Sequence, residues 1–218
     1  MKFYNPKGEE IGSKEDFIKL YSNIYYVLVG KENAEIESVI ESIYMNGIQA
    51  DEEDFIKFLK WKVGDKKEDI GTITTVRGHG INVDKIKQLA RDLKCSGLKF
   101  EGTLSIEDVK KIYNFIVDTG ITNVGSVYSL AIISMITKGQ FPIYDMFADV
   151  GLEAVSNGVE TRSEIEYEVM PDKTSANSVM KRYTNYIDRL NNEFGNRWKK
   201  SRDVDRALWA YGHMFFIK

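Results

Sequence analysis

The residue with the clearest potential for chemistry is an aspartate that follows a very apolar stretch. Asp145 stands immediately before a helical pattern of apolar residues, where the N-cap of a helix would lie. Asp is a preferred N-cap because its carboxylate accepts hydrogen bonds from free backbone N–H groups. A carboxylate held there can also stabilise positive charge on a substrate or orient a water molecule. Asp145 therefore has two compatible interpretations, a structural cap and a catalytic carboxylate.

A second candidate is the turn that precedes this apolar stretch. Gly120 to Gly125 forms a tight-turn pattern, and Ser126 to about Thr137 is apolar on nearly every side of a predicted helix, which should therefore be buried. A turn that opens a helix directs free backbone N–H groups outward, where a phosphate can bind. Asn123 suits the turn because Asn tolerates a left-handed backbone. An ordinary turn between two helices is the alternative.

Basic residues gather near the C-terminus, although the whole chain has a formal net charge of −3. From residue 180 onward there are nine cations and only four anions. The densest part of this region contains Arg197, Trp198, Lys199, Lys200 and Arg202. Cations around one aromatic ring suit a track for nucleic-acid phosphates with one stacking side chain. A solvated loop between two helices explains the same pattern almost as well.

Composition excludes several classes of protein. Cys95 is the single cysteine, so the chain has no internal disulfide framework and no four-cysteine zinc or iron–sulfur site, and we interpret Cys95 as a small core residue. His79 and His213 are the only imidazoles, which disfavours a His-rich metal site, and we expect no metal and no cofactor. The first residues lack a signal-peptide core, and no apolar run approaches the about 20 residues of a membrane span. We expect a soluble, cytoplasmic protein that does not enter membranes.

The two histidines have different surroundings in the sequence. His213 lies near the apolar end of the last predicted helix, where a core or surface role is a simpler interpretation than catalysis. His79 lies between Gly78 and Gly80 in an irregular segment, and Arg77 to Gly80 could form a loop that contacts a base. Of the two histidines, His79 is therefore the freer to act.

Hydrophobic periodicity predicts an all-α fold. The expected helices cover residues 13–30, 34–45, 51–61, 83–93, 105–117, 126–137, 146–155, 178–194 and 203–216. Glycines interrupt residues 62–82, where 72–76 could form a short strand of a minor β pair. We expect one globular unit, residues 1–218, built of two helical lobes.

The turn, the apolar helix and the aspartate together resemble the helix-hairpin-helix DNA glycosylase superfamily. In that family an apolar–x–Gly–apolar–Gly hairpin precedes a helix, and a later element carries the catalytic Asp. Ile121 to Gly125 corresponds to the hairpin, and Asp145 follows Gly125 by 20 positions, as in the family. Residues 201–214 are similar to the family's late helix with its Ala-Leu-x-x-x-Gly pattern. The resemblance covers 105–155 and 201–214, and the late helix, predicted over 201–216, is expected to pack back.

The sequence departs from the family at several positions. Val127 stands where bifunctional members have the lysine that forms a Schiff base, and Asn123 replaces the first hairpin glycine. Met146 and Phe147 replace the histidine that follows the catalytic Asp. The Gln-Thr-like wedge and the four-cysteine iron–sulfur loop are absent. The resemblance therefore implies a monofunctional enzyme that leaves an abasic site, with no lyase step.

The resemblance implies the following mechanism. Backbone N–H groups from Val124 to Ser126 hold a phosphate, and the target base of a DNA duplex is flipped out. Asp145 stabilises the charge that develops on the sugar, while Tyr144 and Phe147 form apolar walls of the pocket. Two other classes of function stay open: a non-catalytic protein of the same fold that binds DNA or a protein partner, and a small-molecule or regulatory helical protein.

Overall fold

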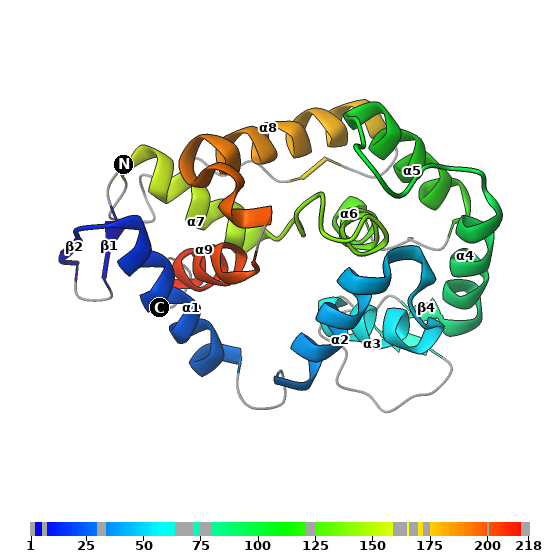
Figure 1. Cartoon of the computed structure of the whole chain (residues 1–218), viewed down its shortest axis with the longest axis horizontal. Coiled ribbons are helices and arrows are strands. Elements are labelled where there is room, and N and C mark those ends of the chain that lie inside the picture. Colours follow the sequence, from blue (N-terminus) through cyan, green and yellow to red (C-terminus); the bar gives the residue numbers. More distant parts are fainter. Residues whose placement is uncertain are drawn as a thin grey trace. The chain divides into compact units, whose positions relative to one another are not determined.

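The computed structural model describes residues 3–5, 8–29, 34–63, 72–74, 80–120, 125–158, 165, 170–171, 175–199 and 201–214. Helices dominate this part of the chain, as Figure 1 shows, so the predicted all-α class with a minor β component is confirmed. The helices are α1 (Lys14–Val29), α2 (Ala34–Asn46), α3 (Glu52–Val63), α4 (Val83–Cys95), α5 (Ile106–Asp118), α6 (Ser126–Ile136), α7 (Met146–Asn157), α8 (Ala176–Phe194) and α9 (Asp203–Met214). Two 3₁₀ helices, η2 (Gly47–Gln49) and η4 (Gly195–Lys199), complete them.

Short antiparallel strand pairs accompany the helices. β3 (Thr72–Thr74) pairs with β4 (Gly80–Asn82), which confirms the strand predicted near 72–76. β1 (Phe3–Tyr4) pairs with β2 (Glu10–Ile11) in the segment before the first expected helix, where no element was predicted.

Local capping sets the start of several helices. At α5, the Asp108 backbone N–H donates to the Ser105 hydroxyl at 3.2 Å, and the Ser105 N–H donates to the Asp108 carboxylate at 2.9 Å. The hydrogen bonds from Ser105 hold the pKa of Asp108 below its ordinary value. Asn82 caps α4 in a similar way, accepting from the backbone N–H of Asp84 at 2.8 Å. These caps explain why the sequence placed the helix starts within a few residues of the observed ones.

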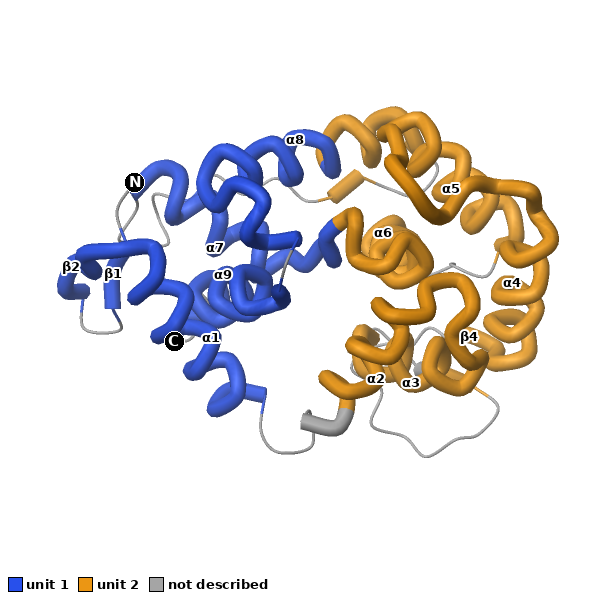
Figure 2. The backbone as a smooth tube through the Cα atoms, viewed as in Figure 1, with its two compact units in different colours: residues 1–33, 142–169, 183–218 blue, residues 34–141, 170–182 orange. Residues whose placement is uncertain are grey.

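The chain divides into two compact units, coloured separately in Figure 2. Unit 1 comprises residues 1–33, 142–169 and 183–218, and unit 2 comprises residues 34–141 and 170–182. Unit 1 therefore contains α1, α7, α9 and most of α8, whereas unit 2 contains α2 to α6.

The apolar helix α6 is the centre of unit 2. Within this unit, α2, α3 and α5 pack against it, and every residue from Ser129 to Thr137 is buried, as its all-round apolar pattern predicted. Tyr44 and Ser134 share a hydrogen bond of 3.0 Å between their hydroxyl groups. Gly139 follows with φ +70°, and a Cβ there would lie 2.8 Å from the Tyr44 ring, so the close approach requires glycine.

Cys95 corrects one prediction from the sequence. We interpreted it as a core residue, but its side chain is exposed at the end of α4. The buried face of that helix includes Val83, Ile86 and Leu93, and Cys95 falls two positions beyond Leu93, off this face. Among the described helices, none is long and apolar enough to cross a membrane.

Candidate functional site around Asp145

Asp145 is the N-cap of α7, as the sequence predicted. Its backbone is extended, with φ −140° and ψ 142°, and the Phe147 backbone N–H donates to its carboxylate at 2.9 Å. Its carbonyl accepts the first helical hydrogen bond, from Asp149 N–H, also at 2.9 Å. The side chain is half-buried. The cap fixes the carboxylate in one orientation while part of the residue stays open to solvent.

A close crossing of α7 and α9 brings the end of the chain beside Asp145. The two helices lie side by side in unit 1 (Figure 1). A Cβ on Gly212 would lie 1.8 Å from the Phe147 carbonyl oxygen, and a Cβ on Gly151 would lie 2.1 Å from that of Leu208. The backbones can approach this closely only because both positions are glycine. The crossing therefore places the last turns of α9 against the first turn of α7.

Three half-buried rings cluster at this crossing. Trp209 and His213 of α9 stack with centroids 4.6 Å apart and planes 10° apart. The Phe147 ring meets both at steep angles, with centroids 5.8 Å from Trp209 and 4.3 Å from His213. Nδ1 of His213 is buried without a hydrogen-bond partner, and burial lowers the pKa of the imidazole, while the charge of Asp145 acts in the opposite direction. A neutral imidazole thus lies within electrostatic reach of the Asp145 carboxylate.

Replacing His213 by Phe is expected to weaken the dependence of stability on pH between about pH 7 and pH 5. In the unfolded chain the imidazole pKa is about 6.5, whereas burial lowers it in the folded protein. The unfolded chain therefore binds more protons in this range. The contribution of a neutral His213 is complete above about pH 6.5 and is lost as the pH falls through the folded-state pKa.

Urea unfolding of the parent protein and of His213→Phe at several pH values measures this difference. His79 is present in both proteins, so its contribution cancels. If the two proteins lose stability equally on acidification, His213 is not desolvated in the way its contacts indicate.

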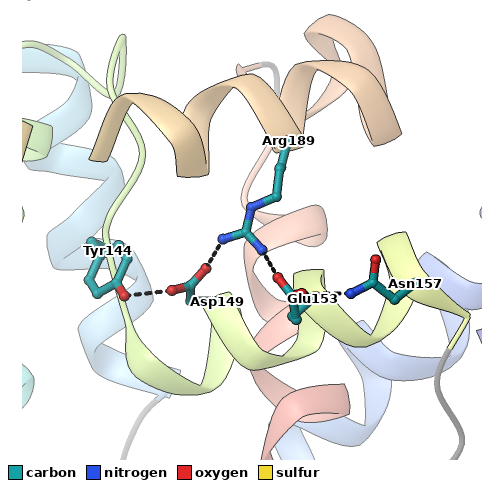
Figure 3. Close-up of polar contacts among 5 residues, drawn as sticks. All are labelled: Tyr144, Asp149, Glu153, Asn157 and Arg189. Atoms are coloured by element: carbon teal, nitrogen blue, oxygen red, sulfur yellow. Dashed lines mark hydrogen bonds and ion pairs between the residues drawn. The ribbon is translucent and has the colours of Figure 1, made fainter. Parts of the chain in front are cut away.

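A polar network with the buried Asp149 at its centre joins α7 to α8 (Figure 3). Asp149 is only 1% exposed, and its carboxylate accepts from the Tyr144 hydroxyl at 2.6 Å and from the Arg189 guanidinium. Arg189 also donates to Glu153, which accepts from Asn157 at 2.6 Å. The sequence analysis did not identify Arg189, Asp149 or Glu153. The signal that the sequence offered was the spacing of Asp145, Asp149 and Glu153 at intervals of four residues, which indicates acidic side chains that need a cation from another element.

The two residues predicted as apolar walls lie in different environments. Tyr144 is fully buried, and its ring packs edge-on against Tyr186 with centroids 5.2 Å apart. Burial and the nearby carboxylates of Asp205, Asp149 and Asp145 raise the pKa of Tyr186 well above its ordinary value. Of the two predicted walls, only Phe147 therefore presents surface beside Asp145.

The predicted anion-binding turn is described only at its end. Asn123 and Val124 lie outside the described residues. Gly125 has φ +102°, a conformation that favours glycine, and Ser126 is buried, with its hydroxyl donating to the Pro171 carbonyl at 2.8 Å. Gly125 and Ser126 belong to unit 2, whereas Asp145 belongs to unit 1. A groove shared by the turn and Asp145 stays a prediction.

Most of the described cations in the predicted phosphate track already contact other groups of the chain. Arg197 forms an ion pair with Glu15 at 2.7 Å, and Arg202, whose side chain is only 11% exposed, forms one with Asp205 at 2.9 Å. Lys199 lies 5.1 Å above the Trp198 ring, and Lys200 is outside the described residues.

Trp198 does not fit the predicted role of a stacking side chain. It is buried, and its indole N–H donates to the side-chain amide oxygen Oδ1 of Asn191 at 2.9 Å. The large apolar ring packs into unit 1, because burial of an aromatic side chain is favourable and Asn191 satisfies its one polar group. The ring is therefore unavailable to a nucleic-acid base.

Two further observations complete the description of the site. Within the part of the chain that the structure describes, no cluster of three or more His, Cys, Asp or Glu side chains could hold a metal ion. Arg77 and His79, the proposed base-contacting loop, lie outside that part.

Comparison of the chain with protein-family models, with curated proteins and with solved structures found no match.

Proposed function

We propose that this protein binds DNA and removes a damaged or modified base by hydrolysing its N-glycosidic bond, with Asp145 as the catalytic carboxylate. One observation carries the proposal: a half-buried carboxylate, held by a helix N-cap, lies beside a surface of three aromatic rings. The aromatic neighbours lower the local dielectric constant, which strengthens the effect of the carboxylate on a developing positive charge. A planar base also suits such a surface, because every base has an aromatic face.

The proposed reaction uses few groups. The bond between the sugar and the base breaks, and its electron pair leaves with the base. The carboxylate of Asp145 stabilises the positive charge that develops on the sugar. A water molecule then attacks the sugar carbon and transfers a proton to Asp145. Because Val127 offers no amine, the product is an abasic site with an unbroken strand.

Two features of the fold support the resemblance to helix-hairpin-helix glycosylases. The order of elements is α5, the buried helix α6, and then α7 with Asp145 at its start. The Ala-Leu-x-x-x-Gly segment of α9 packs on α7, and Gly212 of that segment makes the closest approach. The glycine of the late helix therefore has a structural reason to stand at this position.

A non-catalytic protein that binds DNA or a protein partner is the second candidate. The observation that favours it is the state of the basic segment, where Arg197 and Arg202 already pair with acidic side chains. Paired cations release fewer counterions from a phosphate backbone, so this segment would add little to DNA affinity.

Replacing Asp145 by Asn is expected to reduce base release by at least about a hundredfold. Asn is also a good N-cap, so α7 keeps its start while the charge is lost. The measurement is single-turnover base release from a panel of oligonucleotides with damaged or modified bases. Glu107→Gln, which removes an exposed carboxylate from the first turn of α5, is the matched control and should release bases at the parent rate.

The same panel separates the two candidates. Release that is equal in Asp145→Asn and in the parent would remove Asp145 from the mechanism. Salt-dependent binding to duplex or abasic DNA without release of any base would favour the non-catalytic protein. Absence of both release and binding would leave DNA out of the function altogether.

A further inference from the structure

We infer that Arg189 is a positioning residue for Asp145 and acts on it through Asp149 and Tyr144. Its functional meaning rests on the proposed role of Asp145, but the geometry that carries it is independent of any substrate. Each member of the network lies in unit 1.

The carboxylates of α7 pair with a cation from another helix. Asp149 and Glu153 are four residues apart on one face of α7, and Asp145, the N-cap, stands four positions before Asp149. Like charges at this spacing destabilise a helix. No Lys or Arg occurs between Met146 and Asn157, so α7 has no compensating cation of its own. Arg189 of α8 supplies it, with one guanidinium nitrogen on Asp149 and another on Glu153 (Figure 3).

The second step concerns the backbone on both sides of Asp145. The Tyr144 hydroxyl donates to the Asp149 carboxylate at 2.6 Å, and the Asp149 backbone N–H donates to the Asp145 carbonyl at 2.9 Å. The residue before Asp145 and the residue one turn after it are thus joined to each other. Asp145 lies inside this closed loop, so a movement of Asp149 changes the direction of the Asp145 carboxylate.

The third step concerns what holds Asp149 in place. Asp149 is 1% exposed, so water cannot replace a lost partner without a rearrangement of the helix. Arg189 donates from one terminal nitrogen to Asp149 and from the other to Glu153, so a rigid planar group joins the two carboxylates, which the flexible side chain and point charge of Lys do not reproduce. Arg189 therefore controls the position of Asp149, and through it the position of Asp145.

A purely structural role for the network makes a different prediction. If the ion pairs only attach α7 to α8, apolar side chains of similar size should replace them without consequence for Asp145. The variant Tyr144→Phe/Asp149→Leu/Arg189→Met makes this replacement and avoids an unpaired buried charge. Arg189→Lys is a milder second variant that keeps the charge of the network.

His213 provides a readout that needs no substrate. Its pKa can be measured by NMR, in a chain with only two histidines, and the Asp145 carboxylate raises it. Asp145→Asn should therefore lower the pKa of His213 in the parent protein. In the triple variant we expect the same substitution to lower it by less than half as much, because the carboxylate has moved away. Arg189→Lys should give a smaller loss in the same direction.

The outcomes separate this inference from the proposed function. An equal effect of Asp145→Asn on the pKa of His213 in the parent, the triple variant and Arg189→Lys would overturn the positioning role. So would the absence of any effect in the parent. Arg91→Met, which removes an exposed arginine that pairs with Glu52 in unit 2, should leave the effect unchanged. A failure to release bases in the parent would sink only the proposed function.

Discussion

Replacing Arg189 by Met is expected to lower the free energy of unfolding by about 3 kcal/mol, the lower end of the range for a broken buried ion pair. The substitution leaves Asp149 buried without its cation, and leaves its negative charge one helical turn from Asp145 and Glu153. The lower end applies because the side chain of Glu153, the other carboxylate that loses Arg189, is 23% exposed, so water can solvate it after the substitution. Urea unfolding at neutral pH measures the change.

Arg91→Met is the matched control for this substitution. Arg91 also pairs with a carboxylate, that of Glu52, but at 3.5 Å and with 54% of its side chain exposed. Exposed pairs of this kind contribute about 0–1 kcal/mol. The triple variant with an apolar network should recover much of the stability that Arg189→Met loses. Equal losses in Arg189→Met and Arg91→Met would show that the buried network contributes no more than a surface pair.

Replacing Gly212 by Ala is expected to destabilise the protein by about 3 kcal/mol or more, above the usual cost of overpacking. The added methyl group would lie 1.8 Å from the Phe147 carbonyl oxygen and 2.7 Å from the Gly151 backbone nitrogen. Both contacts are with backbone, so no side chain can rotate away, and α7 and α9 must separate. Thermal or urea unfolding measures the loss, and base release should fall with it because the first turn of α7 carries Asp145.

Gly12→Ala is the control for the crossing. A Cβ at Gly12 would have no heavy atom within 4 Å, so the substitution should change stability by less than about 1 kcal/mol, mainly through the unfolded chain. If Gly212→Ala were as stable as Gly12→Ala, the helices would have to pack less closely than described.

The sequence predicted well those features that depend on neighbouring residues. The caps at Ser105 and Asp145 involve partners two or three positions away, and the apolar pattern of α6 required burial whatever packed around it. Helix bounds followed from such local signals. The strand pair formed by residues 3–4 and 10–11 was not predicted, because strands of two residues are too short to show an alternating hydrophobic pattern.

Features that depend on distant residues could not be predicted in the same way. Arg189 meets Asp149 across 40 positions of sequence, and the basic pattern around residue 197 gave no sign that Glu15, near the other end of the chain, would pair with Arg197. Trp198 shows the same difficulty, because nothing local distinguishes a buried ring from one that stacks on a base. The spacing of carboxylates along α7 was a usable signal, since three acids without a cation require a partner from elsewhere.

The acidic side of α7 has a consequence for the order in which the protein folds. An isolated α7 segment would combine repelling carboxylates with a central glycine, which costs roughly 0.5–1 kcal/mol relative to alanine, so it would hardly be helical. We expect its helical structure to become favourable only after Arg189 of α8 pairs with Asp149 and α9 packs against Gly151. Residues 146–157 should thus be late folders, and the carboxylate at their start acquires its orientation only when the surrounding helices have assembled.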